Sequence, residues 1–447
     1  MTIKMKDSGI KWIGMIPEGW NVLKLKSCFS FGKGLSITKA DLCEQGLGVI
    51  SYGQVHSKDN IGASVRESLI RYLPFDHVSL SDNSRVSIND LIFADTSEDL
   101  EGCGNCIFID SENVKYAGYH TIILHPKTKE TSRYFGYLFA TDAWKTQVRE
   151  NASGVKVYSI TQDMLKNAYL LAPPIETQYQ IVSFLDAKCA EIDALIAAKE
   201  KSNTLLKEYR QSIIFEAVTK GLDPNAPMKD SGIEWIGMIP EGWDVLKLKS
   251  SYSFGKGLSI TKADLCEQGL GVISYGQVHS KDNIGASVRG SLIRYLPFDH
   301  ECLSDNSRVS INDIVFADTS EDLDGCGNCI FIDSENVKYA GYHTIILHPK
   351  TKETSRYFGY LFATDAWKTQ IRENASGVKV YSITQDMLKN AYLLAPPIET
   401  QYQIVSFLDA KCAEIDVLIE ANEKTINQLK EYRQSVIFGA VTGKMEV

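Results

Sequence analysis

The organisation of this chain follows from one segment, which reads Pro173-Pro174-Ile175-Glu176-Thr177-Gln178-Tyr179-Gln180-Ile181-Val182-Ser183-Phe184-Leu185-Asp186, and from the residues after it to about Thr219. The two prolines end whatever precedes them, because proline has no N–H and biases the residue before it toward extended geometry. No glycine or proline then occurs until Gly221. The segment therefore predicts one helix of about forty residues, roughly 60 Å long at ~1.5 Å per residue.

Apolar side chains recur along this helix in alternating steps of three and four residues, which is the spacing of a coiled-coil seam. Polar residues interrupt the seam at Lys199, Asn203 and Arg210. A single helix of this kind would expose its seam to water, so it requires a partner helix. The predicted seam residues are Val182, Leu185, Cys189, Ile192, Ile196, Leu206 and Ile213.

The partner lies in the same chain, because the sequence is duplicated. Residues 6–192 match residues 229–415 without insertion or deletion, a shift of 223 positions (229 − 6). A period this long indicates a duplicated domain, since solenoid repeats span about 20–50 residues. The changes over this span are Lys11/Glu234, Asn21/Asp244, Cys28/Ser251, Phe29/Tyr252, Glu67/Gly290, Val78/Glu301, Ser79/Cys302, Leu91/Ile314, Ile92/Val315, Glu101/Asp324 and Val148/Ile371.

The second copy of the helix follows Pro396 and Pro397. We expect an α+β fold, in which two mixed α/β domains are separated by two long helices packed as an antiparallel coiled coil. The predicted divisions are 1–174 for the first domain, 175–220 for the first helix, 221–397 for a linker and the second domain, and 398–447 for the second helix. The second seam comprises Val405, Leu408, Cys412, Ile415, Ile419, Ile426, Leu429 and Val436.

Within each repeat, short β-like runs alternate with turn signals. Trp12 and Trp20 are expected to anchor the core, because aromatic side chains supply much of the buried area. Turns are predicted at 17–19 and 31–36, and a loop at 151–158. The first repeat is predicted to contain strands at 22–25, 69–73, 85–93 with a turn at Asn89-Asp90, 106–109, 119–124 and 168–172, and helices at 132–150 and 161–166. A further strand is predicted to begin at Gly48 and to end in a polar-aromatic loop that reaches His56.

Composition limits the class of protein. The chain has 447 residues, with 44% apolar and 23% charged residues, which is ordinary for a soluble protein of two or three domains. No segment approaches ~18 continuous apolar residues, and the N-terminus lacks the apolar core of a signal peptide, so we expect a cytoplasmic protein. The pairs Cys28/Ser251 and Ser79/Cys302 would break a disulfide framework, which favours reduced thiols.

Catalytic signatures are missing from the sequence. There is no methyltransferase motif of the Asp- or Asn-Pro-Pro-aromatic type, no dinucleotide-binding glycine motif and no phosphate-binding P-loop. Cys103 and Cys106, repeated as Cys326 and Cys329, are the best metal candidates, but nothing supplies two further zinc ligands at a convincing spacing. The acidic run 95–101 could hold Mg²⁺ for hydrolysis, yet no nearby lysine completes a nuclease-type site. We predict no catalytic residues and no bound metal.

What remains is a recognition surface of polar and basic loop residues. Glutamine can bridge the N6 and N7 atoms of adenine, arginine and lysine can reach guanine or phosphate, and aromatic side chains contact bases. Arg66 belongs to this set as well. The predicted DNA-binding residues are Lys33, Lys39, Tyr52, Gln54, His56, Lys58, Arg71, Lys156 and Tyr158, with Lys256, Lys262, Tyr275, Gln277, His279, Lys281, Arg294, Lys379 and Tyr381 in the second repeat.

Net charge argues against this prediction when it is taken alone. A formal charge of −9 and a pI near 5.5 disfavour strong unaided binding to nucleic acid, whose affinity comes largely from phosphate neutralisation. Basic residues would have to cluster locally, or a partner would have to supply positive surface.

Three features resemble the specificity subunit of type I restriction–modification systems. They are the segment from Asp7 to Trp20, the Pro173-Pro174-Ile175-x-x-Gln178-x-x-Ile181 entry to a long helix, and Ser153-Gly154 about twenty residues before those prolines. The resemblance covers essentially the whole chain and occurs twice. It implies a non-catalytic DNA-binding subunit. It also implies two modification subunits that carry S-adenosylmethionine and methylate adenine, and motor-nuclease restriction subunits that add cleavage.

The near-identity of the repeats sharpens this expectation. Residues 33–158 and 256–381 present the same polar loops, so a two-fold arrangement would match an inverted repeat in DNA. We therefore predict a bipartite, palindromic target with an unread spacer. Partners enclosing the duplex would answer the charge objection. The alternatives are a coiled-coil scaffold whose duplicated domains bind protein, and a metal-dependent hydrolase that uses the 95–101 cluster.

Overall fold

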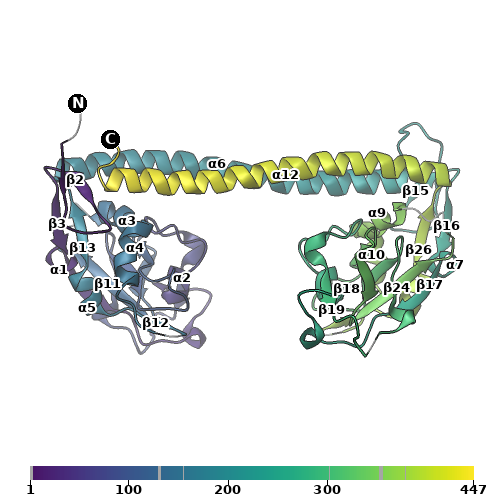
Figure 1. The fold of residues 1–447 in the computed structure, drawn as a ribbon, viewed down its shortest axis with the longest axis horizontal. Helices are drawn as coiled ribbons and strands as arrows, with labels where there is room; N and C mark the ends of the chain where they lie inside the picture. The colour runs from purple at the N-terminus through teal and green to yellow at the C-terminus, as the bar shows by residue number, and fades with distance from the viewer. Residues whose placement is uncertain (1–3, 129–131, 155, 302, 352–355, 378) are drawn as a thin grey trace. The chain divides into compact units, whose positions relative to one another are not determined.

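The computed structural model describes residues 4–128, 132–154, 156–301, 303–351, 356–377 and 379–447 (Figure 1). Val155 of the predicted 151–158 loop and Cys302 lie outside the described residues. The chain groups into two compact units, Met1–Glu200 with Glu423–Val447, and Lys201–Asn422. Each unit holds one domain and a part of each long helix. The unit boundaries therefore fall inside the helices.

The described residues of the first unit form thirteen strands, and they include parts of two long helices. Its strands are β1 (Met5–Asp7), β2 (Met15–Pro17), β3 (Asn21–Lys24), β4 (Phe29–Lys33), β5 (Leu47–Ile50), β6 (Arg71–Leu73), β7 (Leu91–Ala94), β8 (Thr96–Ser97), β9 (Cys106–Phe108), β10 (Val114–Ala117), β11 (Thr121–Pro126), β12 (Tyr158–Ser159) and β13 (Tyr169–Ala172). Its helices are α1 (Leu25–Cys28), α2 (Tyr52–Val55), α3 (Ser132–Ala140), α4 (Asp142–Arg149), α5 (Gln162–Asn167), and parts of α6 (Ile175–Lys220) and α12 (Ile398–Val441).

The second unit repeats these elements, as the duplicated sequence predicts. Its strands are β14 (Met228–Asp230), β15 (Met238–Pro240), β16 (Asp244–Lys247), β17 (Tyr252–Lys256), β18 (Leu270–Ile273), β19 (Arg294–Leu296), β20 (Ile314–Ala317), β21 (Thr319–Ser320), β22 (Cys329–Phe331), β23 (Val337–Ala340), β24 (Thr344–Pro349), β25 (Tyr381–Ser382) and β26 (Tyr392–Ala395). Its own helices are α7 (Leu248–Ser251), α8 (Tyr275–Val278), α9 (Tyr357–Ala363), α10 (Asp365–Arg372) and α11 (Gln385–Asn390).

A four-stranded antiparallel sheet, in the order β4-β11-β7-β9, forms the centre of the first domain. Successive side chains of a strand point to opposite faces. Leu91 and Phe93 of β7 therefore enter one apolar cluster, while Ile92 and Ala94 enter another. The first cluster includes residues of α3 and α4, and the second includes residues of the β10-β5-β6 sheet. The central sheet is thus covered on both faces.

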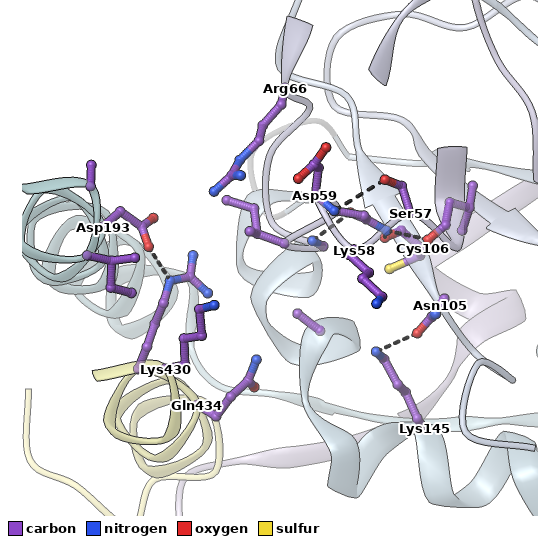
Figure 2. A pocket seen from close by; sticks show the side chains of 18 of the residues that line it. Ser57, Lys58, Asp59, Arg66, Asn105, Cys106, Lys145, Asp193, Lys430 and Gln434 are labelled. Carbon is purple, nitrogen blue, oxygen red and sulfur yellow. Dashed lines mark hydrogen bonds and ion pairs between the residues drawn. The ribbon is translucent and has the colours of Figure 1, made fainter. Parts of the chain in front are cut away.

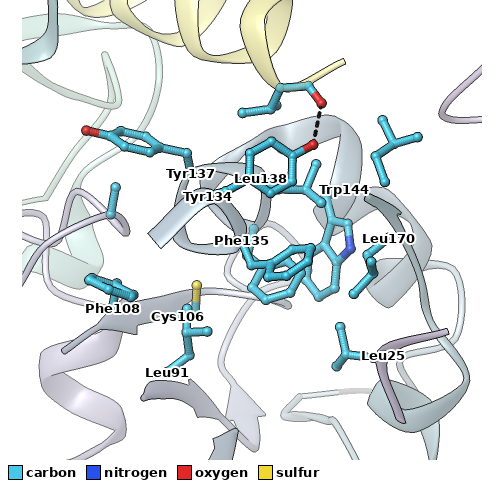
Figure 3. Close-up of a cluster of buried hydrophobic side chains, with 14 of the residues drawn as sticks. Leu25, Leu91, Cys106, Phe108, Tyr134, Phe135, Tyr137, Leu138, Trp144 and Leu170 are labelled. Carbon is cyan, nitrogen blue, oxygen red and sulfur yellow. Dashed lines mark hydrogen bonds between the residues drawn. The ribbon is translucent and has the colours of Figure 1, made fainter. Parts of the chain in front are cut away.

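The first cluster also connects the domain to the long helix (Figure 3). Trp144 of α4 is fully buried, and its ring centroid lies 4.4 Å from that of Phe139. Its indole Nε1 donates to the carbonyl of Tyr169 at 3.0 Å. Tyr169 begins β13, the strand that leads through the two prolines into α6. The helix therefore leaves the domain in a direction fixed by the core.

The structure replaces the predicted helix at 132–150 with two shorter helices, α3 and α4. The break lies at Thr141, whose backbone is extended and whose hydroxyl accepts a hydrogen bond from the backbone N–H of Trp144. This is an N-cap, which begins a new helix. The predicted apolar face is buried throughout, at Tyr134, Leu138, Trp144 and Val148.

The predicted turn at 31–36 is wrong, because β4 extends to Lys33 and pairs with β11. A Cβ added at Gly32 would lie 2.9 Å from the carbonyl oxygen of Asn83. The glycine therefore permits a close approach within a strand and does not mark a turn. The strand predicted to begin at Gly48 ends at Ile50, and the segment predicted as a loop after it contains the short helix α2.

The N-terminal turn prediction is confirmed, since Trp20 N donates to Pro17 O at 3.0 Å. Trp20 is buried, as expected of a core anchor. Trp12 is only partly buried against the same cluster, and its indole N–H has no partner among the described residues. Two-stranded pairs also complete the fold, β1 with β2 and β3 with β13. The β1, β2, β8, β10 and β12 strands were not predicted.

The long helix α6 has the predicted bounds, whereas α12 ends at Val441, before Gly443, whose φ of 68° is a left-handed conformation. Parts of the two helices pack together in each unit. In the second unit Asn203 contacts Asn422, and Arg210 pairs with Asp416. Residue numbers rise along one helix as they fall along the other, so the two segments run in opposite directions there.

Polar side chains pair between the two helices at three places along the seam. Arg433 is 6% exposed, and its Nε lies 3.0 Å from Asp193 Oδ1 in the first unit. In the second unit Arg210, 7% exposed, pairs with Asp416. These pairs are equivalent under the shift of the repeat, with the roles of the helices exchanged. Buried Asn422 donates to Asn203 Oδ1 at 2.8 Å. Unpaired polar groups here would be costly, so such pairs favour one register.

The predicted seam is correct in part. Leu185, Cys189, Ile192, Leu408, Ile415, Ile419, Ile426 and Val436 are buried. Val182, Ile196, Leu206, Ile213, Val405 and Leu429 are only half-buried. Near the helix ends, Ile181, Ile214 and Ile404 are buried in place of their predicted neighbours, and Ile437 is buried beside Val436. The reason is that the ends of the helices pack against a domain as well as against a helix, and Ile181 belongs to the domain core.

Each domain core is completed by the C-terminal end of the helix from the other repeat. Val436, Ile437, Ala440 and Val441 of α12 belong to the first core cluster. The Tyr134 hydroxyl donates to the carbonyl of Val441 at 2.9 Å (Figure 3). In the second unit the Tyr357 hydroxyl donates to the carbonyl of Val218 in α6 at 2.7 Å. A buried tyrosine thus caps a helix end in both units.

Candidate nucleic-acid interface

A tight turn between β10 and β11 in the first domain carries Tyr119 and His120. A Cβ added at Gly34 would lie 1.8 Å from the carbonyl oxygen of Gly118. A Cβ at Gly118 would lie 2.0 Å from Ser51 Oγ. Only glycine fits at these two positions, so the turn is held close to the strand ends. His120 has a φ of 55°, which is uncommon for a residue other than glycine and often occurs at functional sites.

Four aromatic rings meet at this turn. The ring centroid of Tyr52 lies 5.5 Å from that of Tyr119, 5.6 Å from that of His120 and 6.2 Å from that of His56, all edge-on. The Tyr52 N–H donates to the carbonyl of Tyr119 at 3.2 Å, which ties α2 to the turn. We call these four residues the ring cluster. Burial raises the pKa of the Tyr119 hydroxyl, and nearby Tyr52 adds to the rise.

Polar contacts fix both histidines. Nδ1 of His120 lies 3.2 Å from Asp95 Oδ1, and a carboxylate can only accept, so Nε2 of His120 is left for a ligand. The His120 side chain is 57% exposed. Nε2 of His56 lies 2.7 Å from the carbonyl of Thr96, and its Nδ1 lies 3.3 Å from the amide nitrogen of Asn105. His56 therefore serves to position the cluster, whereas His120 presents its ring outward.

Tyr158 joins this region through the pairing of β12 with β8, which places Tyr158 opposite Ser97. Lys156, just before β12, is exposed. The structure therefore brings Tyr52 and His56 of the predicted set together, and it places Tyr158 on the strand that pairs with Thr96–Ser97, whose Thr96 carbonyl contacts His56. The second domain repeats the arrangement with ring-centroid distances of 5.5, 5.7 and 6.1 Å from Tyr275 to Tyr342, His343 and His279. Tyr381 pairs opposite Ser320, and Lys379 is exposed.

Gln54 lies in α2 beside the ring cluster but has a structural role as well. Its Oε1 accepts from the backbone N–H of Ser51 at 3.1 Å, as in a capping box. The side-chain amide nitrogen is left to donate. Gln277 makes the equivalent bond to Ser274.

The remaining predicted residues lie elsewhere in each domain. Lys33 ends β4, and Lys39 lies in a short turn that Asp41 caps. Arg71 begins β6 and donates to two backbone carbonyls, those of Ser68 and Ile70. Lys58 lines a cavity beside the long helices. The counterparts Lys256, Lys262, Lys281 and Arg294 occupy the same positions in the second sequence repeat.

Tyr119, His120 and Asp95 were missed as members of one site. The available signal was the Gly118-Tyr119-His120 sequence between two β-like runs. Asp95 belongs to the acidic run that was weighed as a metal site. In the structure its carboxylate contacts His120, while Asp99 Oδ1 accepts from the N–H of Gly102 at 2.6 Å.

The cysteine pair is buried inside the domain. Cys103 and Cys106 are both free thiols, and burial raises the pKa of Cys106 to about 12. Across the described ranges, no group of three or more His, Cys, Asp or Glu side chains is placed to hold a metal ion. No helix in the described part of the chain is long and apolar enough to cross a membrane.

Comparisons with known proteins agree on one family. The family described as "Type I restriction modification DNA specificity domain" matches residues 17–205 and again 240–431. The MjaVIII specificity subunit of a type I restriction enzyme from Methanocaldococcus jannaschii is 24% identical over 316 residues, covering 70% of this chain and 70% of that protein. The EcoKI specificity subunit from Escherichia coli is 19% identical over 447 residues, and the match covers 97% of this chain and 90% of that subunit.

Among solved structures, a chain from "Structural basis underlying complex assembly and conformational transition of the type I R-M system" has a TM-score of 0.65 at 17% identity. The match covers 96% of this chain and 99% of that one, so the two share a fold. Because the two family matches together span most of the sequence, this chain belongs to the type I restriction modification DNA specificity domain family.

Proposed function

We propose that this protein is the sequence-specific DNA-binding subunit of a type I restriction–modification complex, and that it does not itself catalyse a reaction. The observation that carries this proposal is the ring cluster, which occurs with matching geometry in both units. Rigid aromatic and imidazole groups on tight loops suit base contacts, because the recognition surface must be preorganised. Membership of a DNA specificity family supports the same conclusion.

We propose that the partners are double-stranded DNA, two modification subunits that carry S-adenosylmethionine, and restriction subunits where cleavage occurs. Two kinds of relative support partner assembly, the specificity subunits of restriction enzymes and a chain from a type I complex-assembly structure. The net charge of −9 also favours partners, because an acidic chain needs positive surface around a duplex. The complex would act in the cytoplasm, where its DNA lies.

We propose further that α6 and α12 form one antiparallel coiled coil and that the target is bipartite and palindromic. Two equivalent ion pairs support the helix arrangement: Asp193–Arg433 in the first unit, and Asp416–Arg210 in the second. An antiparallel pair with two-fold symmetry would require such an exchange. Two near-identical recognition domains related by a two-fold axis would then bind equal half-sites on opposite strands, separated by an unread spacer.

Mapping of methylated adenines in a host that expresses the complex tests this proposal. The expected result is one motif whose half-sites are inverted copies of each other, methylated equally on both strands. Two unrelated half-sites would contradict the equivalence of the domains, and a direct repeat would contradict the antiparallel helices. Binding of the reconstituted complex to DNA should weaken as salt rises. A complex that binds no DNA at any salt concentration would leave a protein-binding scaffold as the function.

A further inference from the structure

A cavity of about 650 Å³ lies within the first unit, between the first domain and the two long helices (Figure 2). On the domain side, Lys58, Arg66 and Lys145 line it. On the helix side, α12 contributes Lys430 and Arg433. Figure 2 shows the ammonium groups of Lys58 and Lys145 directed into the cavity from the domain. The cavity thus gathers basic groups from segments far apart in the sequence.

Lys145 is the most unusual of these groups. It lies on α4, and its Nζ donates to the side-chain oxygen of Asn105 at 2.7 Å. A neutral amide is a weak partner for a buried ammonium, because removing a charge from water is costly unless an opposite charge replaces the water. Burial accordingly lowers the pKa of Lys145. Lys368 and Asn328 repeat the contact at 2.8 Å in the second unit, so it is a constant feature of the domain.

Among the described residues, three of the other four basic groups of the cavity have no carboxylate partner. No ion pair involves Lys58, Arg66 or Lys430 within the part of the chain that the structure describes. The lining contains five basic residues and three acidic ones, Asp59, Asp193 and Glu200. Asp193 is already engaged, since its Oδ1 forms an ion pair with Nε of buried Arg433 at 3.0 Å. The cavity is therefore positive in a protein whose net charge is −9.

The second unit shows that the arginine can reach across to the helices. Arg289, the counterpart of Arg66, lies 3.5 Å from Asp416 on α12, which also pairs with Arg210. An arginine at this position can therefore span from its domain to the helix pair. A guanidinium with that reach could close over a bound anion and donate two parallel hydrogen bonds to it.

We infer that the cavity binds a phosphate group, held by Lys58, Arg66 and Lys145 from the domain and by Lys430 from α12. Phosphate offers several acceptor oxygens and a negative charge, which matches four donors that have no carboxylate partner among the described residues. The source of the phosphate is either the DNA backbone or a free phosphate-bearing molecule. The first source rests on the proposed function. Bound there, a backbone phosphate would fix the register of the duplex against the helices and carry no base information.

The experiment compares the full-length protein, in complex with its modification subunits, with the double variant Lys58→Ala/Arg66→Ala. Both side chains are exposed, so the variant should fold. The matched control is Lys6→Ala/Lys26→Ala, which removes the same charge from exposed positions of the same domain outside the cavity. The first measurement is the slope of log K for DNA binding against log salt. Each lost phosphate contact reduces the slope by about 0.9, so two groups that share one phosphate should reduce it by about one.

The second measurement titrates inorganic phosphate, without DNA, and follows the thermal unfolding temperature. A reduced salt slope in the cavity variant but not in the control, with unchanged half-site preference, assigns the site to backbone phosphate. Stabilisation by phosphate that the cavity variant loses, without a change in slope, assigns it to a free ligand. If the variant behaves as the control does in both measurements, the inference is overturned. Failure of the wild type to bind DNA would refute the proposed function, and the phosphate titration would still test the cavity.

Discussion

Replacing Tyr134 with phenylalanine tests how each domain core is completed, because it removes a single oxygen from a fully buried side chain. The lost hydroxyl donates at 2.9 Å to the carbonyl of Val441, which is also fully buried. This carbonyl is one of the last four of α12, and the last four carbonyls of a helix receive no hydrogen bond from an N–H of the same helix. Leaving a buried acceptor unpaired costs about 1–3 kcal/mol. We expect Tyr134→Phe to destabilise the docked end of α12 by about 2 kcal/mol.

Native-state hydrogen exchange is the suitable assay, because it measures local opening and does not assume that a chain of two units unfolds in one step. A cost of about 2 kcal/mol should speed exchange at residues 436–442 by roughly 30-fold. Tyr357→Phe should do the same at the end of α6 around Val218 and leave residues 436–442 unchanged. Tyr179→Phe, at a position that is 52% exposed on α6, is the control and should have no effect. Equal exchange in Tyr134→Phe and this control would refute the docking of α12 described above.

Three further outcomes are expected. Changing Gln54 and Gln277 together to alanine should relax base choice equally in both half-sites of the mapped methylation motif. It should also lower the stability of each domain by about 1 kcal/mol, because the capping hydrogen bond is lost. Equal weakening of binding on every DNA sequence would reassign both residues to phosphate contact. Burial raises the pKa of Cys106 to about 12, so this thiol should resist alkylation in the native protein at pH 8, whereas exposed Cys43 should react. Mass spectrometry of the alkylated protein measures both. Equal labelling of the two cysteines would contradict the burial of Cys106 in the domain core. The pKa of the Asp41 carboxyl is lowered chiefly by the hydrogen bond that it accepts from the backbone N–H of Thr38. The carboxylate therefore stabilises the fold above the unfolded pKa near 3.8, and this stabilisation is lost as the pH falls through the folded pKa. Asp41→Asn should lower the urea midpoint at pH 6 but not at pH 2, and an equal decrease at both pH values would contradict the capping role of Asp41.

The long helix could be predicted closely because its signals are local. Two prolines and a long run without glycine predict the bounds of α6, and the helix has the same bounds in the structure. Which apolar residues are buried could not be predicted as well, because Ile181 and Ile214 face a domain that the helix pattern does not contain. The turn predicted around Gly32 was wrong for the same reason, because the segment that this glycine contacts cannot be identified from the local sequence. Its role is set by Asn83, which is distant in the sequence.

The recognition loops illustrate the same limit. Tyr52, His56 and Tyr158 could be proposed from residue type, since each is a polar aromatic side chain in a loop-like segment. Their association depends on two pairings between distant segments, Tyr52 N–H to Tyr119 O and β12 with β8. His120 was missed because its left-handed backbone and its contact with Asp95 appear only once β10 and β11 are placed.

The exchange of helix ends imposes an order on biosynthesis. The second unit is one continuous segment, Lys201–Asn422, so it can fold as soon as that segment has left the ribosome. The first unit also requires residues from Glu423 onward, although its domain is made first. During that delay, the apolar surface that later packs against Val436, Ile437 and Ala440 stays exposed to solvent. The earliest-made domain is therefore the last to mature, and we expect it to be the part of the nascent protein that chaperones hold.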